Sequence, residues 1–210
     1  MNILMNFRQI VKTFIPSKKL SIFVLIVASL GIISGAIFLV MINQNDKSVV
    51  INELNGFLSN INSNSINNVQ ALKNSLFNNY VYIVLIFILG LSLIGTLVNL
   101  FFTYIKGFIL GFSISSLIYT YGVKGILASV IYIVPVIVNL FLIVLITSYT
   151  LVLAKYLYTL ILGNRNTGFK MFLKKYFIIF IVISVVTIFT SLMEAFLTPG
   201  LFKLVVKLFM

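Results

Sequence analysis

The sequence predicts an all-α membrane protein, a bundle of about five transmembrane helices. Of its 210 residues, 61% are hydrophobic and only 9% are charged, whereas soluble domains are about half apolar and a quarter charged. Apolar runs of about 20 residues, long enough to cross the ~30 Å hydrocarbon core as helices, recur along the chain. A chain of this composition has too few polar residues to cover its own surface, and we expect a single membrane domain over residues 1–210.

The first predicted span is the apolar run of residues 20–42, which follows a basic N-terminal segment. This run is longer than the apolar region of a signal peptide, and no small-residue cleavage motif precedes the polar stretch after it. We therefore expect a retained transmembrane helix.

A polar, Asn-rich segment follows over residues 43–79. Its apolar residues nevertheless recur at helical spacing, on one face around Leu54 and on a second face around Leu72. Residues 63–65, Ser-Asn-Ser, suit a turn between the two faces. We predict an extracytoplasmic helical hairpin, which serves either as a docking surface for partners or as a lid over the bundle.

The later spans are interrupted by charges, glycines and one proline. They are predicted at residues 80–102, 107–121, 126–154 and 176–198. Pro135 is expected to break the run 126–154, because proline removes a backbone hydrogen bond and clashes with the preceding turn. The piece before it, residues 126–134, is then either re-entrant or a crossing of its own.

Two further segments are expected at the membrane surfaces. Residues 155–175 carry several basic side chains and are predicted to be cytoplasmic. The segment of residues 199–210 begins at a Thr198-Pro199 pair that suits a helix start. Its two lysines, Lys203 and Lys207, lie four residues apart on an otherwise apolar helix. This pattern is typical of a helix lying in the membrane interface.

The distribution of basic residues predicts the orientation. With an inner N-terminus and five crossings, the larger set is cytoplasmic: Arg8, Lys12, Lys18, Lys19, Lys106, Lys155, Arg165, Lys170, Lys174 and Lys175. The smaller set is outside: Lys47, Lys73, Lys124, Lys203 and Lys207. Lys and Arg favour cytoplasmic loops, so we expect a multi-pass plasma-membrane protein with its C-terminus outside. A separate crossing by residues 126–134 would reverse the C-terminus.

Composition also narrows the function. The net charge of +12 is explained by the flanks of membrane spans, and no basic stripe with interleaved aromatic residues indicates nucleic acid. The chain has no Cys and no His, which excludes thiol nucleophiles and Ser-His mechanisms. Its acids are Asp46, Glu53 and Glu194, and no glycine-rich phosphate loop occurs. We predict a protein that is not an enzyme and has no cofactor or metal.

Two stretches resemble the stage II sporulation protein M family. The first is Leu89-Gly-Leu-Ser-Leu-Ile-Gly95 through Phe102, running on into Ile105-Lys-Gly-Phe-Ile-Leu-Gly-Phe112. The second is Ser191-Leu-Met-Glu-Ala-Phe-Leu-Thr-Pro199. The family often has further polar or proline positions after the central proline, and here only Asn139 follows Pro135 closely.

The resemblance implies a membrane anchor and scaffold of endospore formers. Such a protein sits in the mother-cell membrane during engulfment and helps to hold the peptidoglycan-degrading stage II sporulation proteins D and P. The alternative function is the permease subunit of an ATP-driven or secondary transporter, indicated by a broken helix at Pro135 or by an amphipathic coupling helix within residues 156–175.

Individual residues carry competing interpretations. Glu194 is either a partner contact or an interfacial carboxylate, with Lys124 as its expected ion-pair partner. Lys106 either caps a helix and reaches headgroups or lines a pathway. Pro135 and Asn139 mark either a kink or a binding site in a broken helix.

Small residues indicate close helix contacts. Gly107 and Gly111 form one Gly-x-x-x-Gly motif, and Gly31 and Gly35 form another. Such motifs let helix backbones approach closely, either within the chain or against a partner. Pro199, at the end of the last span, completes the candidate partner or packing residues.

Overall fold

The computed structural model describes residues 16–62, 68–163 and 168–209. The described residues form six helices and no strand, and 94% of these residues are helical. The helices are α2 (Lys18–Met41), α3 (Gln44–Asn62), α4 (Asn68–Leu89), α5 (Leu93–Tyr121), α6 (Val123–Ile161) and α7 (Phe169–Phe209). Five of them, all but α3, are long and apolar enough to cross a membrane. The predicted fold class is therefore confirmed.

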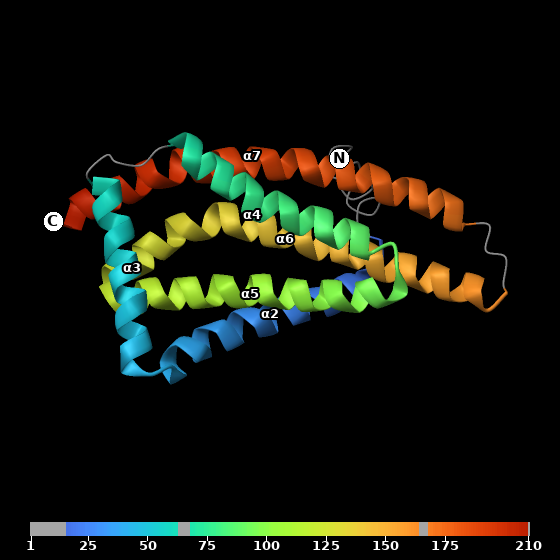
Figure 1. The fold of residues 1–210 in the computed structure, drawn as a ribbon, viewed down its shortest axis with the longest axis horizontal. Coiled ribbons are helices and arrows are strands. Elements are labelled where there is room, and N and C mark those ends of the chain that lie inside the picture. The colour runs from blue at the N-terminus through green and yellow to red at the C-terminus, as the bar shows by residue number, and fades with distance from the viewer. Residues whose placement is uncertain (1–15, 63–67, 164–167, 210) are drawn as a thin grey trace, which may run out of the picture.

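The five long helices lie roughly side by side, and α3 stands across one end of the bundle (Figure 1). That end also holds the turn between α5 and α6, whereas the connections from α4 to α5 and from α6 to α7 lie at the opposite end (Figure 1). Gly122 makes the turn between α5 and α6 possible, because its φ of 57° lies in the left-handed region that favours glycine. We call these the α3 end and the opposite end.

The predicted boundary between the second and third spans is wrong. The chain turns at residues 90–92, and Ser92 caps α5 by accepting a hydrogen bond from the Gly95 amide at 2.9 Å. Lys106 and Gly107, expected at a helix boundary, lie in the middle of α5 instead. Their charge and missing side chain indicated a loop, but both have a role inside the bundle.

The expected hairpin is correct only in its first arm, which is α3. The second arm is not separate, because α4 runs without a break from Asn68 to Leu89 and is itself the second span. The expected turn at residues 63–65 lies outside the described residues. The polar start of α4 therefore belongs to a transmembrane helix, and two of its polar side chains, Ser75 and Asn79, contact the bundle.

Neither Pro135 nor Pro199 ends a helix. α6 is continuous over 39 residues with Pro135 inside it, so residues 126–134 are not a separate piece. α7 is continuous over 41 residues through Pro199, so residues 199–210 do not begin a new helix. Residues 155–161 and 169–175, expected in a cytoplasmic segment, extend these two helices. Long membrane helices tolerate proline because packed neighbours hold the helix in place, and Pro135 is buried.

Backbone contact joins α2 to α5 through glycine. Gly31 and Gly35 on α2 face the backbone of Tyr104 and Phe108 on α5. In return, Gly107 and Gly111 on α5 face the carbonyls of Ala28 and Ile32 on α2. The two Gly-x-x-x-Gly motifs thus face each other within one chain, the arrangement that small residues permit in membranes.

A buried apolar core lies among α4, α6 and α7, where Ile83, Ile146, Tyr176 and Ile183 are at most 1% exposed. Polar groups accompany this core. Thr103 on α5 and Thr147 on α6 are fully buried, and their hydroxyl oxygens lie 3.0 Å apart. The Tyr176 hydroxyl donates to the Phe87 carbonyl at 3.0 Å, which ties α7 to α4.

The contact between Thr103 and Thr147 gives a first testable expectation. Thr147→Val should lower stability by about 0.6–1.7 kcal/mol, the range measured for hydrogen bonds between membrane helices. Thermal unfolding in detergent would measure it. Thr159→Val is the matched control, because the Thr159 hydroxyl bonds only the Tyr156 carbonyl of its own helix. An equal loss in both variants would contradict an inter-helix role for Thr147.

Candidate functional site

A polar cluster joins α4 to α7 near the α3 end of the bundle. Glu194 on α7 accepts a short hydrogen bond from the Ser75 hydroxyl and one of 2.7 Å from the Asn79 amide. Ser75 and Asn79 lie four residues apart and therefore on one face of α4. The Asn79 amide also lies 3.5 Å from the Ser191 hydroxyl, one turn before Glu194. Asn79 is 7% exposed, so this contact is inside the bundle.

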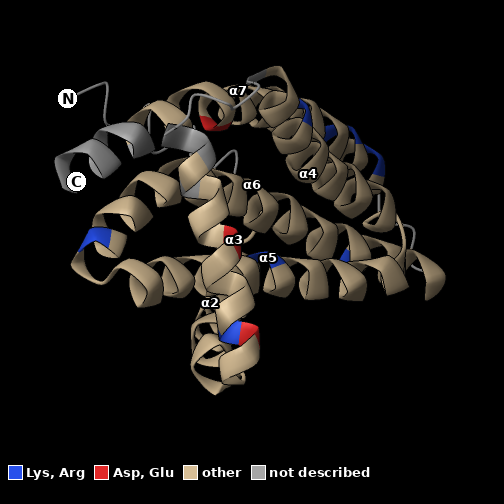
Figure 2. Cartoon of the chain, turned by 60° about the vertical axis from the view of Figure 1, so that its left-hand side comes forward, with Lys and Arg blue, Asp and Glu red and all other residues tan. Residues whose placement is uncertain are grey.

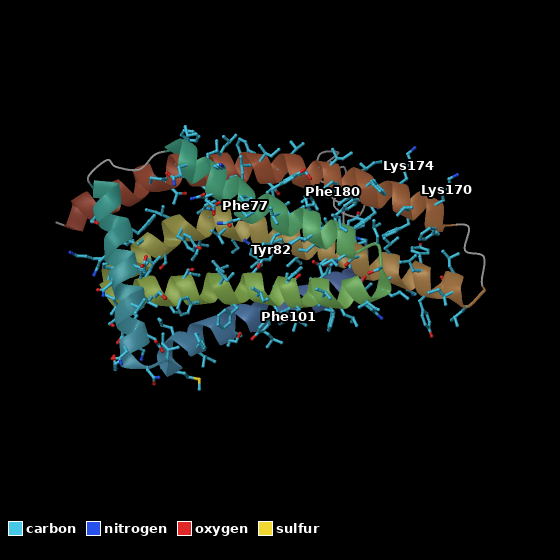
Figure 3. All side chains as sticks on the ribbon, in the orientation of Figure 1. Phe77, Tyr82, Phe101, Lys170, Lys174 and Phe180 are labelled. Atoms are coloured by element: carbon cyan, nitrogen blue, oxygen red, sulfur yellow. The ribbon has the colours of Figure 1, made fainter. Side chains whose placement is uncertain are left out.

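Lys106 adds a positive charge to the cluster from α5. Its ammonium group donates to the Asn79 side-chain oxygen at 3.4 Å and lies 4.5 Å from the centre of the Tyr82 ring. Tyr82, labelled in Figure 3, lies between α4 and α5, and its ring also packs on Phe102 at 5.8 Å. Asn79 therefore bridges a carboxylate and an ammonium: its amide nitrogen donates to Glu194, and its side-chain oxygen accepts from Lys106.

This bridge explains how two charged residues are tolerated inside a membrane bundle. Ionisable groups within spans normally pair with one another or with polar groups, because an isolated charge is costly there. Lys106 and Glu194 are on different helices and share Asn79 on a third. We call Ser75, Asn79, Lys106, Ser191 and Glu194 the amide-bridged cluster. Together its members fix the relative positions of α4, α5 and α7.

A cavity of about 510 Å³ opens beside Glu194, between α3 and the ends of α5, α6 and α7. Its walls are mainly apolar and include Leu54 and Phe57 of α3. Tyr132, a hydrogen-bond partner of Ser113, lies on the bundle side. Glu53 of α3 also borders the cavity, so two of the three acids in the sequence face the same space. Figure 2 shows the acidic positions on α3 and α7 only.

Comparison with known proteins identifies the family. A family model described as stage II sporulation protein M matches residues 18–199. The chain belongs to the stage II sporulation protein M family. No curated protein and no solved structure matches the chain. With its five apolar helices, this family member is a multi-pass membrane protein of a sporulation family. The amide-bridged cluster lies entirely within the matched region.

The structure brings together only some of the candidate residues of this family member. Glu194 and Lys106, which were not predicted to lie near each other, meet through Asn79. Lys124, the expected partner of Glu194, lies in the first turn of α6, and the hydrogen bonds described for Glu194 come from α4. Pro199 borders the cavity beside Glu194.

The other candidate residues are buried among packed helices. Gly107 and Gly111 pack against α2. Asn139 on α6 is buried, and its oxygen accepts a 2.6 Å hydrogen bond from the Thr190 hydroxyl on α7. The Asn139 amide nitrogen has no hydrogen-bond partner among the described residues. Pro135 lies one turn before Asn139 inside the unbroken α6.

Sequence reasoning missed Ser75 and Asn79, which hold the cluster together in this family member. Both belong to the Asn-rich segment, whose asparagines we did not interpret as functional. A signal was present, because Ser75, Asn79 and Tyr82 are spaced three to four residues apart and lead directly into an apolar run. Polar side chains on one face at the start of a span indicate a buried polar contact.

Proposed function

We propose that this protein is a non-enzymatic membrane scaffold of engulfment, which holds the peptidoglycan-degrading stage II sporulation proteins D and P at the mother-cell membrane. The observation that carries the proposal is the cavity beside Glu194. It is bordered by α3 and by Glu194, whose side chain the amide-bridged cluster holds against α4. A scaffold needs a surface to which partners can dock, and the cavity with its two acidic residues supports the proposal as a candidate for that surface.

The proposal requires the α3 end to face the extracytoplasmic side. Lys106 lies within a span and no longer counts toward either side. Among the described residues, the remaining basic ones are still more numerous toward the opposite end: Lys18, Lys19, Lys155, Lys170, Lys174 and Lys175. The positive-inside rule therefore favours a cytoplasmic N-terminus, an extracytoplasmic α3 end and an extracytoplasmic C-terminus.

The chemistry of the cavity suits a partner segment that is apolar and carries a basic side chain. Its walls supply apolar surface from α3 and α5, and Glu53 and Glu194 supply negative charge, with no Lys or Arg among the described residues that line it. Such complementarity gives specificity as well as attraction. Partner hydrolases would then perform the chemistry while this chain supplies position.

The permease alternative receives no support from the described residues. It predicted a broken helix at Pro135 or a separate coupling helix within residues 156–175. α6 is unbroken, and the described residues of that segment continue α6 and α7. We therefore propose one function only.

Co-purification from sporulating cells tests the scaffold. The full chain, tagged at its N-terminus, is extracted in mild detergent, and co-purifying proteins are identified by mass spectrometry. Recovery of proteins D and P is expected. Glu53→Lys should reduce that recovery several-fold, because it reverses a charge at the cavity, and the exposed position lets the fold persist. Asp46→Lys, the same change in the first turn of α3, is the control.

The opposite results are equally clear. Recovery of a cytoplasmic ATPase in place of the two hydrolases would overturn the scaffold. Equal recovery of proteins D and P with Glu53→Lys and the unchanged protein would remove the cavity from the proposal. Circular dichroism of both variants in detergent would verify that each remains helical.

A further inference from the structure

Two cavities lie between α2 and α6, away from the amide-bridged cluster. One, of about 240 Å³, has Lys18, Ser21 and Leu25 on the α2 side and Phe141 and Ser148 among its α6 residues. The other, of about 320 Å³, is bordered by Ser17 and Leu20 at the start of α2 and by residues of α6: Val152, Lys155, Tyr156 and Thr159. Both lie between the same two helices.

The two cavities follow a single face of α6. The lining positions on α6 are 141, 144, 145, 148, 152, 155, 156 and 159, a spacing of three and four residues that keeps one face. From 141 to 159 this face is about 27 Å long at ~1.5 Å per residue. One leaflet of a bilayer, headgroup included, is about 20–22 Å thick. The two cavities therefore follow one another along α6 over about the length of one lipid molecule, and together we call them the α2–α6 groove.

The chemistry of the groove changes along its length. Around residues 141–148 the walls are almost entirely apolar, and large apolar side chains flank them: Leu25 is 51% exposed and Phe141 is 58% exposed. Toward Lys155 the walls become polar, with a tyrosine, a threonine and the start of α2. The side chain of Ser17 makes no capping hydrogen bond, so the first amides of α2 point toward this end without that partner.

Charge has one sign in the groove. Lys18 and Lys155 line it, and neither cavity has an Asp or Glu in its walls. Both lysines are exposed. A ligand that fits must therefore have an apolar chain at one end and a negative charge at the other.

We propose that the α2–α6 groove binds an anionic phospholipid of the membrane. An acyl chain lies along the apolar part between Leu25 and Phe141, and the phosphate lies between Lys18 and Lys155, near the start of α2. The groove lies between two membrane-spanning helices with exposed apolar side chains beside it, so lipid reaches it directly from the bilayer. This inference is independent of the proposed scaffold function, because it concerns other residues, toward the opposite end of the bundle.

Lipid binding to the purified full chain tests the proposal. Native mass spectrometry in detergent compares dioleoyl phosphatidylglycerol, dioleoyl phosphatidylcholine and glycerol 3-phosphate as probes. Phosphatidylglycerol should bind at least about 10-fold more tightly than phosphatidylcholine, because each lysine near a headgroup contributes about 5-fold. Glycerol 3-phosphate should not bind at millimolar concentration, because it lacks the apolar chains.

Two sets of variants locate the site. Lys18→Gln combined with Lys155→Gln should remove the preference for phosphatidylglycerol. Lys170→Gln combined with Lys174→Gln is the matched control, because these lysines point away from the bundle at the same end of the molecule (Figure 3). Leu25→Trp fills the apolar part at an exposed position and should weaken both lipids several-fold.

Each contrary result overturns the lipid site. Equal binding of the two lipids, or equal losses in the two double variants, would show that the groove does not select the phosphate. Binding of glycerol 3-phosphate as tight as that of phosphatidylglycerol would make it a site for free anions. Size-exclusion chromatography of each variant in detergent verifies that a loss of binding is not a loss of the fold.

Discussion

Replacing Gly111 by alanine is expected to destabilise the bundle, whereas the same replacement of Gly56 should stabilise it slightly. A Cβ atom at Gly111 would lie 2.0 Å from the Ile32 carbonyl oxygen, and one at Gly35 would lie 2.1 Å from the Phe108 carbonyl oxygen. Both obstacles are backbone atoms, so α2 and α5 must move apart to admit even one methyl group. Overpacking of this kind costs about 1–3 kcal/mol and occasionally more, and the backbone contact places Gly111→Ala at the upper end.

Gly56 supplies the control within the same molecule. It lies inside α3, and nothing lies within 4 Å of the position that its Cβ would take. Alanine in an open helix interior is favoured over glycine by about 0.5–1 kcal/mol. Thermal unfolding in detergent should therefore shift down for Gly111→Ala and Gly35→Ala and up for Gly56→Ala. Shifts of the same sign in all three would contradict the close approach of α2 to α5.

The amide-bridged cluster gives the second large effect. Glu194→Gln keeps the size of the side chain and its contact with Asn79 but leaves the Lys106 charge without its counterpart. Lys106→Met keeps the length of the side chain and leaves the Glu194 carboxylate without its positive counterpart. Breaking a buried charge pair from one side costs about 3–5 kcal/mol. Both residues are partly exposed, so we expect about 2–3 kcal/mol for each single variant, less than for a fully buried pair.

The double variant distinguishes charge from packing. Lys106→Met with Glu194→Gln removes both charges at once, so its loss of stability should be clearly smaller than the sum of the two single losses. Thermal unfolding of the four proteins at one pH and one salt concentration gives the interaction free energy. Strictly additive losses would mean that the two charges do not interact through Asn79. Asn79→Leu should be at least as damaging as either single variant, because it removes the bridge and leaves both charges in place.

The sequence was sufficient for the fold class because hydrophobic length determines how many helices can cross a bilayer. The sequence was not sufficient for the helix boundaries, because it does not show the tertiary contacts that stabilise charged residues and prolines within a helix. Lys106 is a costly charge within an apolar span and Pro135 is unfavourable within a helix, so each was interpreted as a boundary. In the folded bundle Asn79 contacts Lys106, and packed neighbours surround Pro135. Tertiary contacts of this kind are not visible in a single sequence.

The candidate site was predictable in its charged members and not in its bridge. Glu194 and Lys106 are rare ionisable residues beside apolar runs, which makes them candidates by position alone. That they share Asn79 depends on the turn at residues 90–92, which sets how α4 lies against α5. With the hairpin expected at residues 43–79, Asn79 was placed outside the second span, and its contact with Lys106 could not be foreseen.

The length of α6 has a mechanical consequence. Its 39 residues extend about 58 Å at ~1.5 Å per residue, nearly twice the ~30 Å hydrocarbon core. Near its end, Tyr156 packs on Phe172 at the start of α7, with ring centres 5.2 Å apart, so the two helices leave the core as a braced pair. A stiff rod held on both sides of a bilayer acts as a lever. We therefore expect a force that tilts α6 at the α3 end to displace its other end in the opposite direction, which would transmit a pull from one side of the membrane to the other.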